Sequence, residues 1–311
     1  MNKALDVSID DAAKVDSSHS HTWAIIRVIL PYFAVPAVAV AAYHWGIAWY
    51  DIGLFLVLVF LSGVGFSVGM HRFFTHHSFK TNSLVKTALG IFGLSGSHIN
   101  IKEYVAAHRC HHAFPDQPED PHSPHYATPE GSKNTLVGLL HAHTGWGFSK
   151  RLNMPEKIQK YASDYHDDDL VNFLDRHHVA IFIGSLLLPA ALGALAAWHW
   201  QGAITGFLWG GLLRLFVADQ VENWGRGISH VFGYQPLRAK GHSTNHWIAV
   251  ISMGEWHNNH HAFPNSARQG LEWWQIDVGY YVILILEKLG LAWDVVRVDR
   301  ARIEAKRVAN S

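Results

Sequence analysis

Histidine is the residue type in this chain whose number and spacing indicate chemistry. The chain has 24 histidines among 311 residues, and eight of them fall into three short clusters. The clusters are His71-Arg-Phe-Phe-Thr-His76, His108-Arg-Cys-His111-His112 and His257-Asn-Asn-His260-His261. On an α-helix, positions i, i+3 and i+4 share one face, so the second and third clusters each present three imidazoles in one direction. Because imidazole binds iron, zinc, copper and nickel, we interpret the clusters as metal ligands.

The number of ligands indicates two metal ions. Eight imidazoles exceed what one tetrahedral zinc or one facial-triad iron uses. Soluble di-iron bundles use Glu-x-x-His on helices, but the one such string here, Glu119-Asp-Pro-His122, contains a proline that excludes a helix. The single cysteine, Cys110, excludes thiolate zinc and iron–sulfur sites, and the His-Glu-x-x-His signature of zinc proteases is absent.

The elements that must position these clusters are predicted to be membrane-spanning helices. The chain is 49% apolar and only 16% charged, which is too apolar for an ordinary soluble protein. Four apolar stretches approach the ~20 residues that cross a bilayer, and short links join them into two hairpins. These spans are expected at residues 23–43, 52–70, 179–198 and 203–221. The predicted fold class is all-α: a multi-pass membrane protein whose cytosolic helical cap carries a histidine-rich site for two metal ions.

The remaining segments fit one domain with short ends. Residues 1–22 are expected to form a polar tail, residues 23–298 the domain, and residues 299–311 a charged tail. Shorter apolar stretches at 83–99 and 271–291 are predicted to be helices at the membrane interface. The first histidine cluster has i, i+5 spacing, which does not share an α-helical face, so we expect it where the second span ends and the chain turns.

Basic residues predict the orientation in the membrane. Both hairpin tips lack Lys and Arg, whereas residues 71–178 hold eleven of the 25 and the residues after Val221 hold ten. By the positive-inside rule, both termini and the histidine site face the cytoplasm. Two crossings separate the first two clusters from the third, which returns all three to one membrane face. Lys+Arg and Asp+Glu balance at 25 each, so nucleic acid is not expected as a partner.

Six motifs carry a resemblance to a known family. They are His71-Arg-Phe-Phe-Thr-His76-His77-Ser78-Phe79, Glu103-Tyr-Val-Ala-Ala-His108-Arg-Cys-His-His112, Glu119-Asp-Pro-His122, His143-Thr-Gly-Trp146, Ser229-His230-Val-Phe-Gly-Tyr234 and Gly254-Glu-Trp-His257-Asn-Asn-His260-His261. In order and spacing they resemble the membrane fatty acid desaturase superfamily, and within it the bacterial type of the acyl-CoA (stearoyl-CoA) Δ9 desaturase family. The resemblance runs from about Ile52 to Val298.

The resemblance implies a ninth ligand, His230, two irons (Fe²⁺/Fe³⁺) and O₂ as co-substrate. The implied iron ligands are His71, His76, His108, His111, His112, His230, His257, His260 and His261. The implied reaction is O₂-dependent desaturation, at Δ9, of a long-chain saturated fatty acyl thioester in unsaturated fatty acid biosynthesis, in the bacterial cell membrane. Acyl-CoA is the expected substrate, with another acyl carrier or a lipid as the alternative. A separate electron donor, such as ferredoxin, rubredoxin or cytochrome b5 with its reductase, is expected as a partner beside the lipid bilayer.

Substrate contacts follow from the same resemblance. Lys150 and Arg151 match the family's basic pair near the CoA phosphates, whereas Ala106 and Ala107 replace the Arg-Asp pair that holds the CoA headgroup in animal relatives. A tunnel for the methyl end of the acyl chain is implied along the second span. Gly63 and Val59, two and three helical turns before the first cluster, are expected to close it. The alternative for Gly63 is that this small residue only lets helices pack closely.

Three residues are expected beside the ligands: Glu103, Asn223 and Arg226. Arg226 stands where the family usually has an asparagine that reaches one iron through water, and Asn223 lies one turn earlier as a substitute. A guanidinium is repelled by two metal cations, so Arg226 is predicted to point away from them and to pair with Glu222.

Two other functions compete with desaturation. A hydroxylase of the same superfamily would use the same irons to insert oxygen. A histidine-rich metal transporter would instead place ionisable residues in the middle of its spans, whereas these clusters lie at the predicted span ends.

Overall fold

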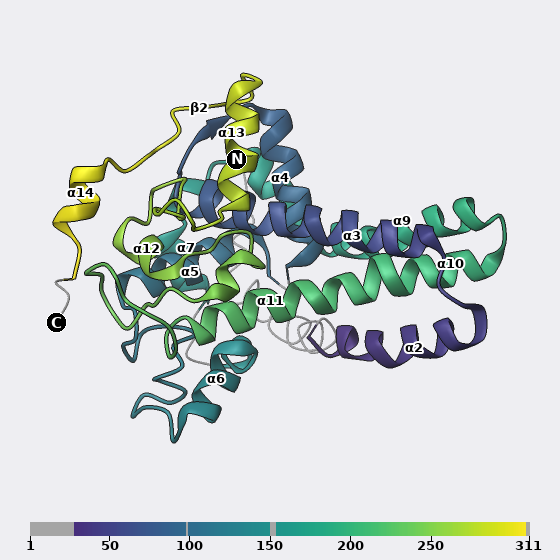
Figure 1. Ribbon diagram of the computed structural model, residues 1–311, viewed down its shortest axis with the longest axis horizontal. Coiled ribbons are helices and arrows are strands. Elements are labelled where there is room, and N and C mark those ends of the chain that lie inside the picture. Colours follow the sequence, from purple (N-terminus) through teal and green to yellow (C-terminus); the bar gives the residue numbers. More distant parts are fainter. Residues whose placement is uncertain (1–27, 98, 150–153, 309–311) are drawn as a thin grey trace, which may run out of the picture.

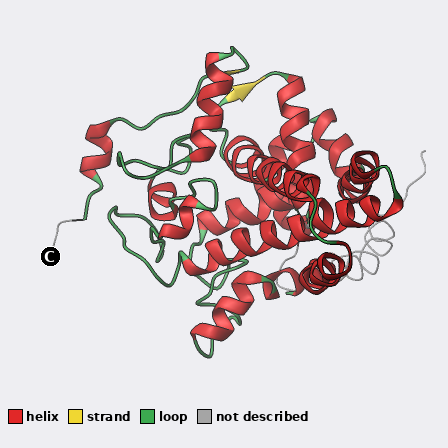
Figure 2. Ribbon diagram, turned by 45° about the vertical axis from the view of Figure 1, so that its right-hand side comes forward, coloured by secondary structure: helices red, strands yellow, loops and turns green. Residues whose placement is uncertain are grey.

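The computed structural model describes residues 28–97, 99–149 and 154–308 of the chain. These residues are mostly helical, as Figure 2 shows, which confirms the mainly helical class. A short antiparallel pair joins β1 (Lys80–Thr81) to β2 (Ala292–Trp293). Its register places Lys80 opposite Trp293, so the pair ties two distant parts of the chain together.

Three helices among the described residues are long and apolar enough to cross a membrane: Trp49–Thr75, His178–Ala197 and Trp200–Ile228. They consist of α3 (Trp49–Gly63) with the π-helical η2 (Val64–Thr75), then α9 (His178–Ala197), then α10 (Trp200–Gly206), the π-helical η5 (Phe207–Leu213) and α11 (Arg214–Ile228). They match the spans predicted at 52–70, 179–198 and 203–221.

Two of these helices continue beyond their predicted ends, on the side that carries the histidines. The first reaches Thr75 and the third reaches Ile228, past the expected ends at residues 70 and 221. Polar side chains in these extensions, such as Arg72 and Asn223, are buried. Apolar composition marks only the part of a helix that faces lipid, so it did not reveal the part that enters the protein cap.

The span predicted at 23–43 falls partly outside the described residues. From residue 28 it forms η1 (Leu30–Phe33), a 3₁₀ turn, followed by α2 (Ala34–Trp45). Pro31 and Pro36 lie in or next to this junction, where the missing N–H of proline weakens a regular α-helix. α2 is not among the three helices above, so a fourth span stays a prediction.

The second hairpin packs through glycine. A Cβ on Gly193 of α9 would lie 2.1 Å from the carbonyl oxygen of Gly202 on α10, so the two backbones touch. In Figure 1 the tips of both hairpins, at residues 46–48 and 198–199, lie at the same end of the molecule.

The opposite end holds a cap of shorter helices (Figure 1). Its elements are α4 (Ser83–Gly96), α5 (Ile101–Ala113), α6 (Thr135–His143), η3 (Gly145–Phe148), α7 (Met154–Tyr161), η4 (Ser163–Tyr165), α8 (Asp169–Arg176), η6 (Trp247–Val250), α12 (His257–Ala262), α13 (Val278–Lys288) and α14 (Arg300–Ala305). α4 lies against η2 with almost no side chain between them, because a Cβ on Gly65 would lie 2.2 Å from the amide of Gly93. The main apolar core joins η2 to α4, α5, α8 and α13.

The helix expected at 83–99 is present as α4, whereas the one expected at 271–291 is shorter than predicted. Residues 271–277 form no α-helix, and α13 begins only at Val278. Asp277 is the reason: its carboxylate accepts the amides of Tyr280 (2.9 Å), Gln269 (2.7 Å) and Gly270 (3.0 Å). The carboxylate thus caps α13 and folds the preceding loop back.

The segment expected as a charged tail is folded as far as residue 308. It contains α14, on which Ile303 is only 5% exposed. Backbone bonds join Arg238 N to Lys306 O (2.7 Å) and Val308 N to Pro236 O (3.0 Å). These contacts tie the segment to the loop before α12.

Candidate metal centre

Helix α5 is anchored at its first turn and carries its three histidines at the other end. Asn100 Oδ1 accepts the amide of Glu103 (2.9 Å), and the Glu103 carboxylate accepts the amide of Asn100 (3.2 Å), which is a capping box. From α8, Asp175 accepts the amide of Ile101 at 2.8 Å. Glu103 therefore serves the start of the helix, and its expected place beside the metal ligands stays a prediction.

Nine histidines converge in two adjoining groups, and they are the nine that the family resemblance implies. The first group is His71, His76, His108, His112 and His260, and the second is His111, His230, His257 and His261. Within each group the candidate ligand atoms lie within 4.8 Å of one another. The Nε2 atoms of His112 and His260 are 2.8 Å apart, and those of His230 and His257 are 2.7 Å apart. Two nitrogens bound to one metal at right angles lie about 3 Å apart, so this spacing suits metal ligands.

The first cluster lies where the first long helix ends, as expected, and this end is π-helical: His71 lies within η2 and His76 is its C-cap. The amide of His76 bonds to the carbonyl of His71 (3.2 Å), an i to i+5 pattern. In this winding, residues five apart come to the same face, and the two ring centroids are 5.0 Å apart. The spacing that does not fit an α-helix fits this one.

Arg109 holds α5 against the end of this π-helix. Its guanidinium donates to Thr75 O (2.9 Å), Tyr161 O (2.8 Å) and Asp164 Oδ1 (2.7 Å). Since Arg109 follows His108 directly, this clamp sets the distance between the first and second clusters.

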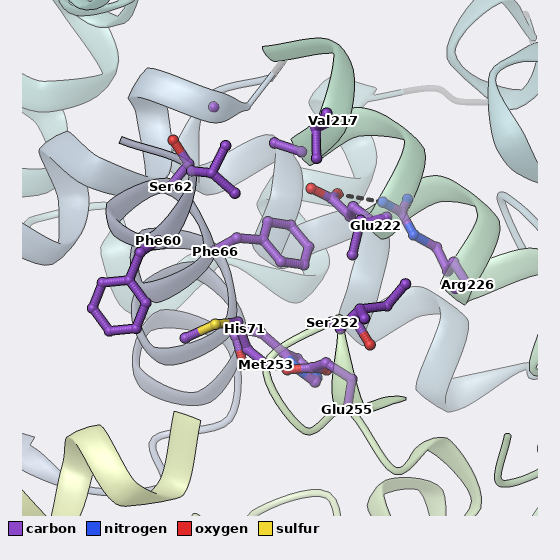
Figure 3. Close-up of a pocket in the computed structure, with 18 of the residues that line it drawn as sticks. Phe60, Ser62, Phe66, His71, Val217, Glu222, Arg226, Ser252, Met253 and Glu255 are labelled. Atoms are coloured by element: carbon purple, nitrogen blue, oxygen red, sulfur yellow. Dashed lines mark hydrogen bonds and ion pairs between the residues drawn. The ribbon is translucent and has the colours of Figure 1, made fainter. Parts of the chain in front are cut away.

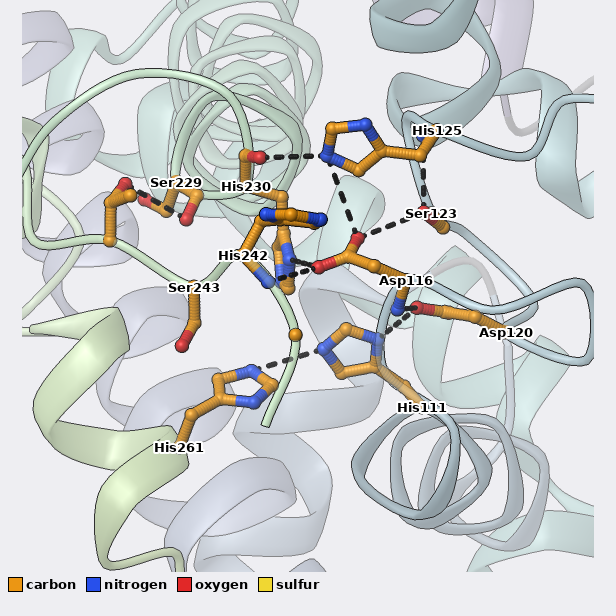
Figure 4. Close-up of polar contacts among 12 residues, drawn as sticks. His111, Asp116, Asp120, Ser123, His125, Ser229, His230, His242, Ser243 and His261 are labelled. Atoms are coloured by element: carbon orange, nitrogen blue, oxygen red, sulfur yellow. Dashed lines mark hydrogen bonds and ion pairs between the residues drawn. The ribbon is translucent and has the colours of Figure 1, made fainter. Parts of the chain in front are cut away.

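Carboxylates hold the outer nitrogens of several rings. Asp120 accepts from His111 Nδ1 and Asp116 from His230 Nδ1, both at 2.8 Å, and Figure 4 shows both rings with Nδ1 directed at these carboxylates. Glu255 lies 2.6 Å from His71 Nδ1. A proton held on Nδ1 leaves the Nε2 lone pair free for a metal, which is the usual arrangement around ligating histidines.

A buried chain of polar contacts supports Glu255. Arg72 donates to Asp277 (2.9 Å) and to Ser67 Oγ (2.9 Å), and Ser67 Oγ donates in turn to Glu255. Arg72 is fully buried, so this chain fixes the carboxylate that orients His71.

Six of the nine candidate rings are held in the neutral form that a metal needs. Burial lowers the pKa of His76, His108, His112, His257, His260 and His261 well below the usual value. Burial alone would raise the pKa of Asp116, but its hydrogen bond with His230 holds that pKa far below the usual range. The site therefore combines these neutral rings with the ionised carboxylate of Asp116. His76 Nε2 is buried without a hydrogen-bond partner among the described residues, so its lone pair is available to a metal.

Sequence reasoning named the rings but not the side chains that orient them. Asp116, Asp120 and Glu255 lie in loops, and their contacts with histidines far away in the sequence depend on the fold. One signal was available: Asp120 and Glu255 lie inside the motifs that carry the family resemblance. Asp116 has φ +56°, a left-handed conformation that is uncommon outside glycine.

Arg226 pairs with Glu222, as predicted, and Figure 3 shows this pair on α11 at the wall of a cavity. The guanidinium also donates to Asn223 Oδ1 (3.3 Å) and lies 5.5 Å from the centre of the Trp146 ring. Asn223 is 7% exposed, and its Oδ1 accepts this hydrogen bond from Arg226. Its role as a substitute for the family asparagine stays a prediction.

An apolar cavity of about 270 Å³ leads from the long helices to the histidines. Val59 and Gly63 line it on α3, and His71, His108 and His257 line it at the site. Figure 3 shows Phe60, Phe66, Val217 and Met253 around it. Both residues expected to close a tunnel therefore lie on one continuous cavity with rings from both histidine groups.

Lys150 and Arg151, the two residues expected to bind the headgroup, both lie outside the described residues. Ala106 and Ala107, at the places of the animal Arg-Asp pair, are 0% and 3% exposed. Buried at these positions, they do not offer a surface contact to a headgroup.

The fold and the site define the class: a helical protein with apolar, membrane-length helices and a histidine cluster suited to metal binding. The family model described as "Fatty acid desaturase" matches residues 44–279. The chain belongs to the fatty acid desaturase family and is therefore an oxidoreductase of a membrane-bound family, which confirms the resemblance seen in its motifs.

Curated relatives span most of the chain. It is 41% identical to a hex-5-enoyl-[acyl-carrier protein] acetylenase from Moorena producens, over 90% of this chain and 89% of that protein. It is 32% identical to an sn-1 stearoyl-lipid 9-desaturase from Synechocystis sp., over 80% of this chain and 72% of that protein. It is 33% identical to an acyl-CoA C20 Delta5-desaturase from Anemone leveillei, over 83% of this chain and 76% of that protein.

Proposed function

We propose that this chain desaturates a fatty acyl chain at two irons held by the nine histidines. The reaction converts –CH₂–CH₂– to –CH=CH– while O₂, two electrons and two protons become two waters. The observation that carries the proposal is the cavity that runs from Val59 and Gly63 to His71, His108 and His257. It offers an acyl chain an apolar path that ends at rings of both groups.

The side chains fit the metal that the proposal requires. The group of five, from His71 to His260, would hold one iron, and the group of four, from His111 to His261, would hold the other. When bound, the irons supply the oxidant that an unactivated C–H bond needs. The protein contributes the alignment of the methylenes beside His108 and His257 and the exclusion of water by the apolar cavity wall.

The proposal includes the membrane arrangement predicted from the sequence: four spans, with both termini and the site in the cytoplasm of a bacterial cell. The shared end of the hairpin tips in Figure 1 supports it, because those tips lack Lys and Arg. α2 overlaps the fourth proposed span, at residues 23–43.

For the substrate, the proposal specifies a long saturated acyl chain carried as a CoA thioester, with the double bond placed at Δ9. Lys150 and Arg151 are proposed to meet the CoA phosphates. The names of the relatives include acyl-carrier protein, lipid and CoA substrates, so the carrier is tested directly by offering the same acyl chain on each of the three.

A second candidate is acetylenic bond formation, which the relative from Moorena producens favours. That reaction removes two further hydrogens from a chain that already has a double bond, with the same consumption of O₂ and electrons. The two candidates differ in the accepted substrate. A hydroxylase, the third possibility within the superfamily, differs in product mass.

The deciding experiment is fatty acid profiling of a desaturase-deficient host that expresses the chain. New monounsaturated acyl chains support desaturation, and a triple bond formed only when an alkenoic acid is fed supports the second candidate. Oxygen-containing products would overturn both.

A further inference from the structure

A basic groove reaches the histidine groups from a different side than the apolar cavity. It has a volume of about 490 Å³. It is lined by His112, Arg238, Ala239, Lys240, His261, Ala262, Pro264 and Lys306. This lining includes three cationic side chains and no acidic one, and it shares no residue with the apolar cavity.

Two stacked histidine rings reach the groove. His112 belongs to the group of five and His261 to the group of four, and their ring centroids are 4.4 Å apart at an interplanar angle of 26°. His112 is partly exposed, whereas the other eight candidate ligands are buried. The groove therefore touches both groups at the point where they come closest to the surface.

Two segments build the cationic wall: the C-terminal segment supplies Lys306, and the loop after α11 supplies Arg238 and Lys240. Lys306 donates to the carbonyl of Ala262 (2.7 Å) at the end of α12, and its ammonium lies 4.8 Å from the centre of the Phe263 ring. Arg238 donates to Ala305 O at 2.6 Å. Arg238 and Lys240 are exposed, so they present their charge to solvent at the rim.

We propose that this groove docks an acidic one-electron carrier protein and that electrons enter the site through the rings of His112 and His261. The inference rests on the proposed desaturation. Reduction of O₂ to two waters takes four electrons, of which the two C–H bonds of the substrate supply two. The carrier protein supplies the other two, one at a time, and is oxidised, while two protons come from solvent.

The acyl carrier is not expected in the basic groove. An acyl chain in the apolar cavity meets His71, His108 and His257, so its carrier end belongs at the mouth of that cavity. The groove has the opposite character, since its lining is cationic and includes two other rings, those of His112 and His261. Cationic surfaces speed the encounter with acidic partners, and salt weakens this attraction.

The test uses the full-length, iron-loaded protein in lipid nanodiscs and a [2Fe–2S] ferredoxin of net negative charge as the probe. Binding is measured at low and high salt for wild type, Arg238→Glu and Lys240→Glu. Lys160→Glu is the control, because Lys160 is exposed on α7 and does not line the groove. Turnover driven by the ferredoxin is compared with turnover driven by dithionite, a small reductant that needs no docking surface; the dithionite is removed after it has reduced the protein and before O₂ is added, because dithionite itself consumes O₂.

The proposal expects the Kd for ferredoxin to rise about tenfold in each groove variant, and to rise with salt in wild type. The ratio of ferredoxin-driven to dithionite-driven turnover should fall by a similar factor, with Lys160→Glu unchanged in both measurements. An unchanged Kd for ferredoxin in both groove variants would overturn the docking proposal. The proposal would also be overturned if those variants lost binding of acyl carrier protein and kept binding of ferredoxin. Absence of turnover with either reductant would instead overturn the proposed desaturation, and the Kd values would still decide the docking site.

Discussion

The amide of His76 donates to the carbonyl of His71 across five residues, at 3.2 Å. This single bond explains how a pair with non-helical spacing belongs to one site. π-Helical turns cost stability relative to an α-helix and concentrate at functional sites. In this protein the π-helix continues the first long helix into the cap, and it brings His71 and His76 together in the group of five.

Loss of one ring from either group should remove metal and activity together. We expect His260→Ala and His111→Ala each to lower turnover at least a hundredfold and to reduce bound iron, because each ring contributes Nε2 to a different group. Elemental analysis of the purified variants measures the iron. His199→Ala, at the hairpin tip, is the control, and full iron and turnover in both site variants would contradict the assignment.

Removal of the charge from a carboxylate that holds the Nδ1 of a candidate ligand should lower metal affinity less than loss of the ring itself. Asp120→Asn keeps an acceptor oxygen for His111 Nδ1 but loses the carboxylate charge. Changes to such partners typically cost 10–100-fold in metal affinity or activity, and we expect this range here. A competition titration with a chelator measures the affinity. Asp167→Asn, on an exposed residue, serves as the matched control, and equal affinities for the two variants would show that Asp120 does not tune the site.

The apolar cavity should set the accepted chain length. A Cβ on Gly63 would lie 3.0 Å from Met253 Cγ, so Gly63→Leu should fill the cavity between α3 and this side chain. We expect a shift to shorter acyl substrates with the double-bond position unchanged. Gly53→Leu is a control on the same helix, since nothing lies within 4 Å of its new Cβ. An unchanged length profile in Gly63→Leu, with normal iron content, would show that the cavity does not hold the methyl end.

The stability of the folded cap should depend on pH through Asp175. Burial raises its pKa to about 6 in the folded protein, above the unfolded value of about 3.9. The folded state therefore binds more protons between these values, and the contribution of Asp175 to stability falls as pH rises through this window. Asp175→Asn keeps an acceptor for the Ile101 amide without the charge.

We expect Asp175→Asn to gain stability relative to wild type as pH rises from about 4 to 7, because it escapes the cost of a buried charge. Thermal unfolding of the detergent-solubilised proteins across this range measures the difference. A difference between the two proteins that does not change with pH would contradict the raised pKa.

The sequence predicted the eight candidate ligands of the three clusters and three long helices because both are local patterns, whereas His230 was expected only from the family resemblance. The i, i+3 and i+4 spacing of His108, His111 and His112 is readable without a structure, and so is apolar length. The partners Asp116 and Asp120 were missed as contacts because loops bring them to the rings. The fold of α14 was missed because one buried side chain, Ile303, and backbone bonds secure an otherwise charged segment.

The most direct test of the account is the mass of the product that the purified, iron-loaded protein forms from a saturated acyl thioester with O₂ and a reductant. The account predicts a product two hydrogens lighter than the substrate, formed by wild type and lost in His260→Ala. A product one oxygen heavier, or a lighter product that His260→Ala still forms at the wild-type rate, would contradict it.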